Sequence, residues 1–151
     1  MLKNIDHIAL REALGNMCFT AAGLAEGTNA NTIQTAAIAN YSIDGVLYTK
    51  AITDNIAMTA AAAQADLTTC MYLVSIDAAG AVTITKGEEA STLAIAAGTA
   101  EAKLPDLPDA QCALGAFKIV LSGGTFTSGT TDLSGTGVTD TFYDYSIMPD
   151  A

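Results

Sequence analysis

The stretch that decides the fold is residues 104–145, which read LPDLPDAQCALGAFKIVLSGGTFTSGTTDLSGTGVTDTFYDY. Strand-like runs alternate here with joints rich in Pro, Gly and Ser, at 104–108, 123–124 and 134–137. A residue that precedes proline is pushed toward extended backbone, and Gly and Ser favour tight turns. The stretch therefore predicts a closely packed β module that contains few titratable groups of the kind that catalysis needs.

Two hairpins are predicted upstream of this stretch. The first turns at Asp44-Gly45, and its alternating apolar residues are Tyr41, Ile43, Val46 and Tyr48. An Asp-Gly pair between alternating apolar residues is the strongest short-range hairpin signal. The second hairpin lies in TTCMYLVSIDAAGAVTITKG at 68–87, with its turn at 77–80. Alternate residues of its first strand, Cys70, Tyr72, Val74 and Ile76, are expected on one face.

Further strands complete the predicted sheets. Residues 111–121 suit a central strand with a bulge at Gly115, and residues 92–97 and 138–147 read as further strands. Residues 58–66 are compatible with either a short helix or a strand of small side chains. At least six strands joined by short turns predict a mainly β fold, an antiparallel β-sandwich or barrel. The aromatic residues expected in its core or at a subunit interface are Phe117, Phe126, Phe142 and Tyr143.

The N-terminal region has a different pattern. Residues 4–15 predict a short helix capped by Asn4, and residues 20–32 predict a loop or an extended arm. The expected organisation is a helix and arm over 1–32, followed by a β domain over 33–151. A short helix is marginal alone and has to pack on something. The residues expected to contact a partner are therefore its apolar ones: Ile5, Ile8, Leu10 and Leu14.

The composition predicts a thin core. The 151 residues include 29 alanines and 20 threonines, whose small side chains each bury little area. A thin core often depends on oligomerisation to bury enough surface. We therefore expect a homo-oligomer.

Charge limits the classes of partner. Six Lys and Arg residues face 16 Asp and Glu residues, which gives a net charge of −10. Binding to nucleic acid or to an anionic membrane needs clustered basic residues, so neither is expected. The sequence has no apolar run of about 18 residues that would span a bilayer, and Asp6, His7, Arg11 and Glu12 interrupt any apolar signal region. We expect synthesis in a cytoplasm.

The sequence contains little that predicts catalysis. His7 is the single histidine, so neither a His-rich metal site nor a catalytic triad has support. The loop at 122–130, SGGTFTSGT, lacks the lysine of a phosphate-binding loop. Asp132, Asp140 and Asp144 could supply oxygen ligands to Ca²⁺, but their spacing matches no EF-hand and aspartates are common in turns. The expectation is a protein that is not an enzyme, with no catalytic residue, no cofactor and no metal site.

The three cysteines are Cys18, Cys70 and Cys112, each in an apolar context. Their odd number argues against a disulfide framework, and their wide spacing argues against a zinc site. We expect three buried free thiols, which fits a reducing compartment.

In its order of motifs the chain resembles small structural proteins of tailed-bacteriophage heads, namely decoration (cement) proteins and head-fibre proteins. The resemblance covers residues 33–149. It rests on the hairpin turn at 41–45, on CMYLVSIDAAGAVT at 70–83 and on the stretch from 104 to 149. Its most distinctive pieces are 104–108, LGAFKIV at 114–120, FTSGTT at 126–131 and TFYD at 141–144. The resemblance implies a β-rich, often trimeric protein that bridges capsid subunits from outside and has no catalytic residue.

The expected function is therefore that of a non-enzymatic virion component, located on the capsid surface, whose partner is the major capsid protein. One alternative is a self-assembling tail-tube, fibre or extracellular lattice subunit. Another is a small ligand- or glycan-binding β module, although the absence of Trp provides no aromatic wall for a sugar.

Overall fold

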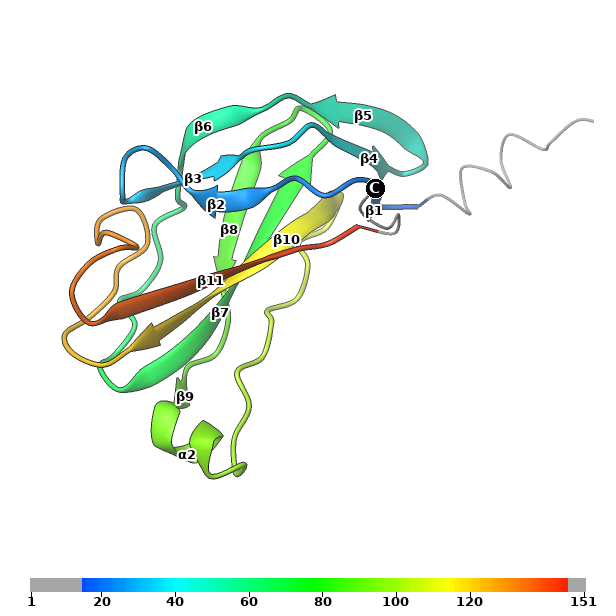
Figure 1. Ribbon diagram of the computed structural model, residues 1–151. Helices are drawn as coiled ribbons and strands as arrows, with labels where there is room; N and C mark the ends of the chain where they lie inside the picture. The colour runs from blue at the N-terminus through cyan, green and yellow to red at the C-terminus, as the bar shows by residue number, and fades with distance from the viewer. Residues whose placement is uncertain (1–14, 147–151) are drawn as a thin grey trace, which may run out of the picture.

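The computed structural model describes residues 15–146 (Figure 1). The described chain is mainly β, as predicted, and every strand pair in it is antiparallel. In chain order the elements are β1 (Met17–Cys18), β2 (Leu24–Glu26), β3 (Thr32–Thr35), β4 (Ala39–Ile43), β5 (Val46–Lys50), β6 (Thr53–Ala57), β7 (Thr68–Asp77), β8 (Val82–Lys86), β9 (Ala90–Ser91), α2 (Thr92–Ala96), β10 (Gln111–Leu121) and β11 (Val138–Asp144).

The strands form three sheets in a sandwich-like arrangement. The largest has the order β11-β10-β7-β8, with β9 paired to one end of β7. The two smaller sheets have the orders β1-β4-β5 and β2-β3-β6. Within residues 15–146 no sheet closes on itself, so of the two predicted architectures the sandwich describes the fold and the barrel does not.

The long strands β7 and β10 hold the larger sheet together. Phe117 of β10 lies opposite Tyr72 of β7, and their rings stack with centroids 4.9 Å apart. The ladder shifts register between Ala113 and Gly115, which confirms the predicted bulge. A side chain at Gly115 would lie 2.2 Å from the carbonyl oxygen of Tyr143 in β11. The bulge therefore needs glycine because a neighbouring strand passes too close for a Cβ atom.

The smaller sheets share one bent hairpin, to which β1 and β2 each add a strand. Strand β3 leads into β4, β5 leads into β6, and the two arms pair on both sides of the bend. The turn is the predicted Asp44-Gly45 pair, with φ of 49° and 72°. Positive φ at both central residues matches the twist of antiparallel strands, which is why this dipeptide specifies the turn. The second predicted hairpin, β7-β8, is also confirmed.

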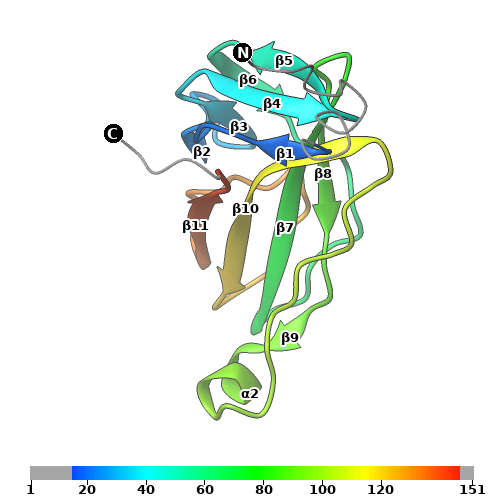
Figure 2. The same ribbon diagram turned by 90° about the vertical axis from the view of Figure 1, so that its right-hand side faces the viewer.

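The core lies where the sheets meet. In Figures 1 and 2 the strands of the smaller sheets cross one end of β7 and β10, and α2 lies near the other end. Buried side chains come from both parts, among them Ile33 and Tyr41 from the smaller sheets and Ile76 and Leu114 from the larger one. The predicted inward face of β7 is correct, since Cys70, Tyr72, Val74 and Ile76 are all inaccessible to solvent.

Three local predictions are wrong. Residues 92–97 do not form a strand, because Thr92–Ala96 is the helix α2, which joins no sheet and has no buried residue. The loop or arm predicted over 20–32 includes β2, which pairs with β3, and Ala22 beside it is fully buried. Residues 58–66 form neither the helix nor the strand considered for them, and only Gln64 makes an isolated bridge, with Phe126.

Candidate partner-binding surface

The four residues predicted to contact a partner, Ile5, Ile8, Leu10 and Leu14, lie outside the described residues, as do His7 and nearly all of the predicted helix 4–15. The structure does place the point where this segment joins the body. Gly15 is the first described residue, and two hydrogen bonds tie it and its neighbour to the turn between β4 and β5. The segment therefore leaves from the end of the β1-β4-β5 sheet.

This junction is fixed by main-chain and side-chain hydrogen bonds. The amide of Gly45 donates to the carbonyl of Gly15 at 3.0 Å, and the amide of Asp44 donates to Asn16 Oδ1 at 2.7 Å. Asn16 Nδ2 in turn donates to the carbonyl of Gln111 at the start of β10, at 3.1 Å. One asparagine thus joins the N-terminal segment to both the small sheet and the large one.

The outer face of the β1-β4-β5 sheet carries exposed apolar side chains beside this junction. Successive side chains of a strand point to opposite faces of the sheet, and Tyr41 of β4 points toward the core. Leu47 of β5 pairs with Ser42, the next residue of β4, so it points away from the core. Leu47 is 65% exposed. Ile38, which precedes β4 and lies four residues before Ser42, is 53% exposed. Met17 of β1 pairs with Ser42, but Met17 is half-buried and Ser42 is inaccessible to solvent, so only Ile38 and Leu47 are exposed here. We call Ile38 and Leu47 the apolar outer face.

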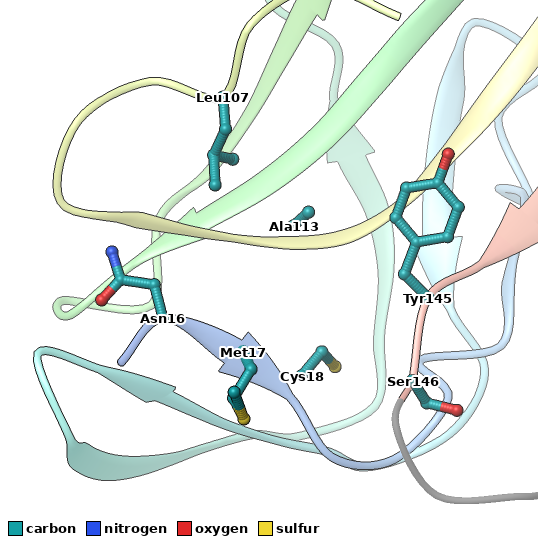
Figure 3. Close-up of a pocket in the computed structure, with 7 residues that line it drawn as sticks. All are labelled: Asn16, Met17, Cys18, Leu107, Ala113, Tyr145 and Ser146. Atoms are coloured by element: carbon teal, nitrogen blue, oxygen red, sulfur yellow. The ribbon is translucent and has the colours of Figure 1, made fainter. Parts of the chain in front are cut away.

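A hollow of about 210 Å³ lies beside β1 (Figure 3). It is bordered by the N-terminal strand, by the Pro-containing connection that precedes β10, and by the residues that follow β11. Its lining is Asn16, Met17, Cys18, Leu107, Ala113, Tyr145 and Ser146. The hollow thus gathers three segments far apart in the sequence around the base of the N-terminal segment.

A second hollow of about 510 Å³ lies between the end of β8 and the connection at 103–106. Lys86, Glu88, Lys103 and Asp106 give it both charge signs. Lys86 is already engaged, because its ammonium pairs with Glu89 at 2.5 Å and donates to the carbonyl of Ala62 at 2.9 Å. No aromatic residue lines this hollow, so it lacks the flat wall on which a sugar ring stacks.

Two groups with shifted pKa values, Cys18 and Tyr145, line the smaller hollow, and four others lie in the sheets and in structural turns. Burial raises the pKa of the Cys70 thiol to about 11, and it raises the pKa of the Tyr72 hydroxyl and the Asp140 carboxyl. Hydrogen bonds from the Thr28 hydroxyl and amide lower the pKa of the Asp54 carboxyl. None of these four groups lines either of the two hollows described above. Their shifts are explained by packing and by turn hydrogen bonds.

The aspartates considered as Ca²⁺ ligands have different structural roles. Asp144 Oδ1 accepts a hydrogen bond of 3.0 Å from the amide of Leu24, which ties β11 to β2, while Asp140 is partly desolvated on β11. In the described part of the chain, no group of three or more His, Cys, Asp or Glu side chains is arranged to hold a metal ion. Across the same residues, no helix is long and apolar enough to cross a bilayer.

Two features of this region lie outside the predicted contact set. The apolar outer face follows from the alternation around Asp44-Gly45, which already separates Leu47 from Tyr48. The packing of β1, which carries Cys18, against β10, which carries Cys112, has no signal in the sequence.

Comparisons with protein-family models, with curated proteins and with solved structures found no match for this chain.

Proposed function

We propose that this protein is a non-enzymatic virion structural protein that binds the outer surface of a tailed-phage capsid, as a decoration or cement protein. The observation that carries the proposal is the position of the N-terminal junction beside the apolar outer face. Gly15 is held at the β4-β5 turn, and Leu47 is exposed only two residues beyond that turn. In this proposal the apolar outer face and the residues that precede Gly15 in the sequence bind the same partner.

The mechanism is multivalent binding to a repeated lattice. Each contact is of modest strength, and many copies, or a trimer that docks as a unit, raise the free energy needed to open the shell. The partner is the major capsid protein. Because the chain has a net charge of −10, a basic surface on that partner would speed association, and this contribution would weaken with salt. The protein would be made in the host cytoplasm and act on the capsid surface.

A second candidate is a subunit that assembles with itself into a tube, fibre or extracellular lattice. It is favoured by the sheet edges, since β5, β6 and β8 each stand at the end of a sheet in the described chain. An edge strand presents free N–H and C=O groups with which a further strand can pair. The capsid proposal is preferred because the apolar outer face, which an edge contact would not use, needs a partner.

The proposal is tested by cosedimentation with undecorated tailed-phage capsids. The decisive variant is Leu47→Asp, which places a charge on the apolar outer face. Leu93→Asp is its matched control, because Leu93 is 75% exposed on α2, away from the small sheets (Figure 1). We expect the wild type and Leu93→Asp to bind saturably and Leu47→Asp to bind at least about tenfold more weakly, since burying an unpaired charge is costly.

A truncation tests the arm separately. It should remove residues 1–14 and stop there, because β1 and the buried Cys18 belong to the core. We expect a folded β body that no longer binds capsids. Full binding by the truncated protein would rule out the arm, and equal binding by both Asp variants would rule out the outer face.

The mass in solution, measured by light scattering over a concentration series, separates the candidates. A discrete trimer supports a preformed decoration protein. Open-ended growth with concentration favours the self-assembling subunit. A monomer that binds a glycan, and does not bind capsids, would replace both with the ligand-binding module.

A further inference from the structure

The outer edge of β5 presents backbone groups with which no described residue pairs. Strand β5 pairs with β4 on one side and lies at the margin of the molecule in Figures 1 and 2. Asn40 of β4 turns its backbone toward β1, because its carbonyl accepts from the Phe19 amide at 2.8 Å and its amide donates to Thr20 Oγ1 at 2.9 Å. Its cross-strand neighbour Thr49 therefore directs its own N–H and C=O away from β4. Leu47, two residues earlier in β5, has the same orientation.

The other long edge strands are less suited to pairing with a copy of themselves. Beside β8, Thr59 Oγ1 accepts a hydrogen bond of 3.1 Å from the amide of Ile84, so this edge is partly covered. In β6, Asn55 has a φ of 54°, which interrupts the extended backbone. Strand β11 carries two aspartates, so self-pairing would bring like charges to one seam. The β5 edge has none of these protections, because residues 45–53 contain no acidic residue and no proline.

A two-fold pairing centred on Tyr48 fits the β5 edge. Thr49 of one copy then lies opposite Leu47 of the other, and each of these two pairs exchanges two N–H···O=C bonds. Tyr48 lies opposite Tyr48 of the second copy in a non-hydrogen-bonded pair, in which side chains are closest. Tyr48 already stacks on Tyr41, with ring centroids 5.6 Å apart. The row of aromatic rings would therefore continue from one copy into the other.

The neighbouring registers need groups that are already bonded. A register centred on Leu47 requires the amide of Gly45, which donates to the carbonyl of Gly15 at 3.0 Å. A register centred on Thr49 requires the backbone of Ala51, whose carbonyl accepts a hydrogen bond of 2.9 Å from a threonine hydroxyl. The register described above uses only outward groups that have no partner in the described chain.

We propose that the β5 edge binds β5 of a second copy of this chain, in an antiparallel two-fold pair that joins two β1-β4-β5 sheets into one. A chain with a net charge of −10 repels its own copy, and this edge is where that repulsion is weakest. The charged residue of β5 is Lys50, which lies opposite Val46 of the second copy and donates to the carbonyl of Gly80 at 3.3 Å. Because both copies use the same edge, the assembly closes at two chains.

The dimer does not depend on the proposed function. Leu47 points away from the core, so the apolar outer faces of both copies lie on the same side of the joined sheet. Two copies would then present two such faces to a repeated lattice. Loss of capsid binding leaves the dimer to be measured in the isolated protein, and a monomer can still be tested for capsid binding by cosedimentation.

The first test is amide hydrogen exchange of the full-length wild type, measured by NMR over a concentration series together with the mass by light scattering. We expect the mass to rise to twice that of one chain. As the dimer forms, exchange at the amides of Leu47 and Thr49 should slow by at least about tenfold. The amides of Tyr48 and Lys50 should be slow at every concentration, because they face β4.

The second test removes the outward donor. Thr49→Pro deletes an N–H that bonds no described residue, and its ring obstructs an incoming strand. We expect the dissociation constant of the dimer to rise by at least about tenfold. Thr49→Val is the matched control: it also loses the hydroxyl that donates to Asn40 Oδ1 at 3.0 Å, but it keeps the N–H. Thr49→Val should dimerise as the wild type does.

A cross-link tests the register. In the pair centred on Tyr48 the two Cα atoms lie about 4.5 Å apart, within the range of a disulfide. We expect Tyr48→Cys to give a covalent dimer with oxidised glutathione. Thr49→Cys should give little, because this side chain lies opposite Leu47 of the second copy. The three native cysteines are buried in the fold.

Four results would overturn the inference. The first is a wild type that stays monomeric at every concentration. The second is a monomer in which the amides of Leu47 and Thr49 are protected, since the chain itself would then cover the edge. The third is a trimer or open-ended growth, and the fourth is a dimer that Thr49→Pro leaves unchanged. Should Thr49→Pro fail to fold, exchange in the wild type still decides whether the edge is paired.

Discussion

The hydroxyl of Tyr72 donates a hydrogen bond of 3.2 Å to the side-chain carbonyl of Gln64, and both residues are inaccessible to solvent. The amide group of Gln64 donates to the carbonyls of Thr68 and Ile119, at 3.1 and 3.2 Å. The backbone of Gln64 also pairs with that of Phe126. One buried side chain therefore fixes the irregular segment 58–66 against the larger sheet and against the loop that follows β10.

Replacing this glutamine should destabilise the fold. Gln64→Leu removes one acceptor and two donors from a dry site, so we expect the free energy of unfolding to fall by about 2–4 kcal/mol. Gln34→Leu is the matched control, because Gln34 is less buried and its amide makes one bond, of 2.8 Å, to the carbonyl of Glu26. Its expected cost is about 1 kcal/mol. Urea unfolding measures both, and equal costs would contradict the role of the buried network.

The bulge at Gly115 should not tolerate a methyl group. The Cβ of Gly115→Ala would lie 2.2 Å from the carbonyl oxygen of Tyr143 and 2.6 Å from Leu24 Cδ1, so β11 would have to move. We expect a loss of about 2–3 kcal/mol in thermal or urea unfolding. Gly123→Ala is the control, since a Cβ there meets nothing within 4 Å. Gly123→Ala should change the free energy of unfolding by no more than about 1 kcal/mol in either direction. A loss as large as that of Gly115→Ala would refute the steric explanation.

The ion pair between Glu89 and Lys86 should make the stability of the fold depend on pH in the acid range. Burial alone would raise the pKa of this carboxyl, but hydrogen bonds from Lys86, from the Ala65 amide and from Thr68 hold it below its usual range. A lowered folded pKa contributes stability that is present above the unfolded value of 4.5 and is lost as the pH falls through the folded value. Glu89→Gln should therefore flatten the decline in stability below about pH 4.5.

The size of that effect is limited by solvent. The Glu89 side chain is 26% exposed, so screening should keep the difference to about 1 kcal/mol or less. Glu88→Gln, at the exposed neighbour of Glu89, is the control. Unfolding curves collected between pH 3 and pH 7, chosen to bracket about 4.5, should separate the two variants. Identical acid profiles for both would show that the Lys86 pair does not contribute.

The N-terminal junction should loosen when Asn16 is replaced. Asn16→Ala leaves the Asp44 amide without its 2.7 Å acceptor, so hydrogen exchange at Asp44 should accelerate, with a smaller increase at Gly45. Because the site is exposed, the global stability should fall by about 1 kcal/mol or less. Asn31→Ala, which removes a side-chain bond to the carbonyl of Gly129 instead, should leave exchange at Asp44 unchanged. Unchanged exchange in Asn16→Ala would mean that the asparagine does not hold the junction.

Much of the larger sheet was predictable because its signals are local. The alternation from Cys70 to Ile76, the turn at 77–80 and the strand at 111–121 all have the expected structure. The Asp44-Gly45 turn is specified by two residues that adopt positive φ, with no help from distant contacts. The exposure of Leu47 follows from the same alternation, so part of the candidate surface was also predictable.

The segments that were mispredicted are those whose conformation depends on neighbours. Residues 92–97 contain apolar residues in a strand-like order, yet they have no sheet to join and form a short exposed helix. Residues 24–26 read as a loop, but they pair with β3 and the Leu24 amide donates a hydrogen bond to Asp144, which makes them a strand. Alanine and threonine are compatible with helix, strand and coil alike, so in these segments propensity leaves the choice to tertiary contacts.

The sequence by itself determined the antiparallel β class, the two hairpins, the bulge at Gly115 and the acidic character of the chain. Each of these follows from residue spacing, turn chemistry or a sum of charges, which are properties of the chain alone. The tertiary structure decided the packing of β1 against β10, the buried network of Gln64 and the attachment of Gly15 at the Asp44-Gly45 turn. These depend on the relative placement of strands far apart in sequence, which only the packing of the sheets around a shared core can fix.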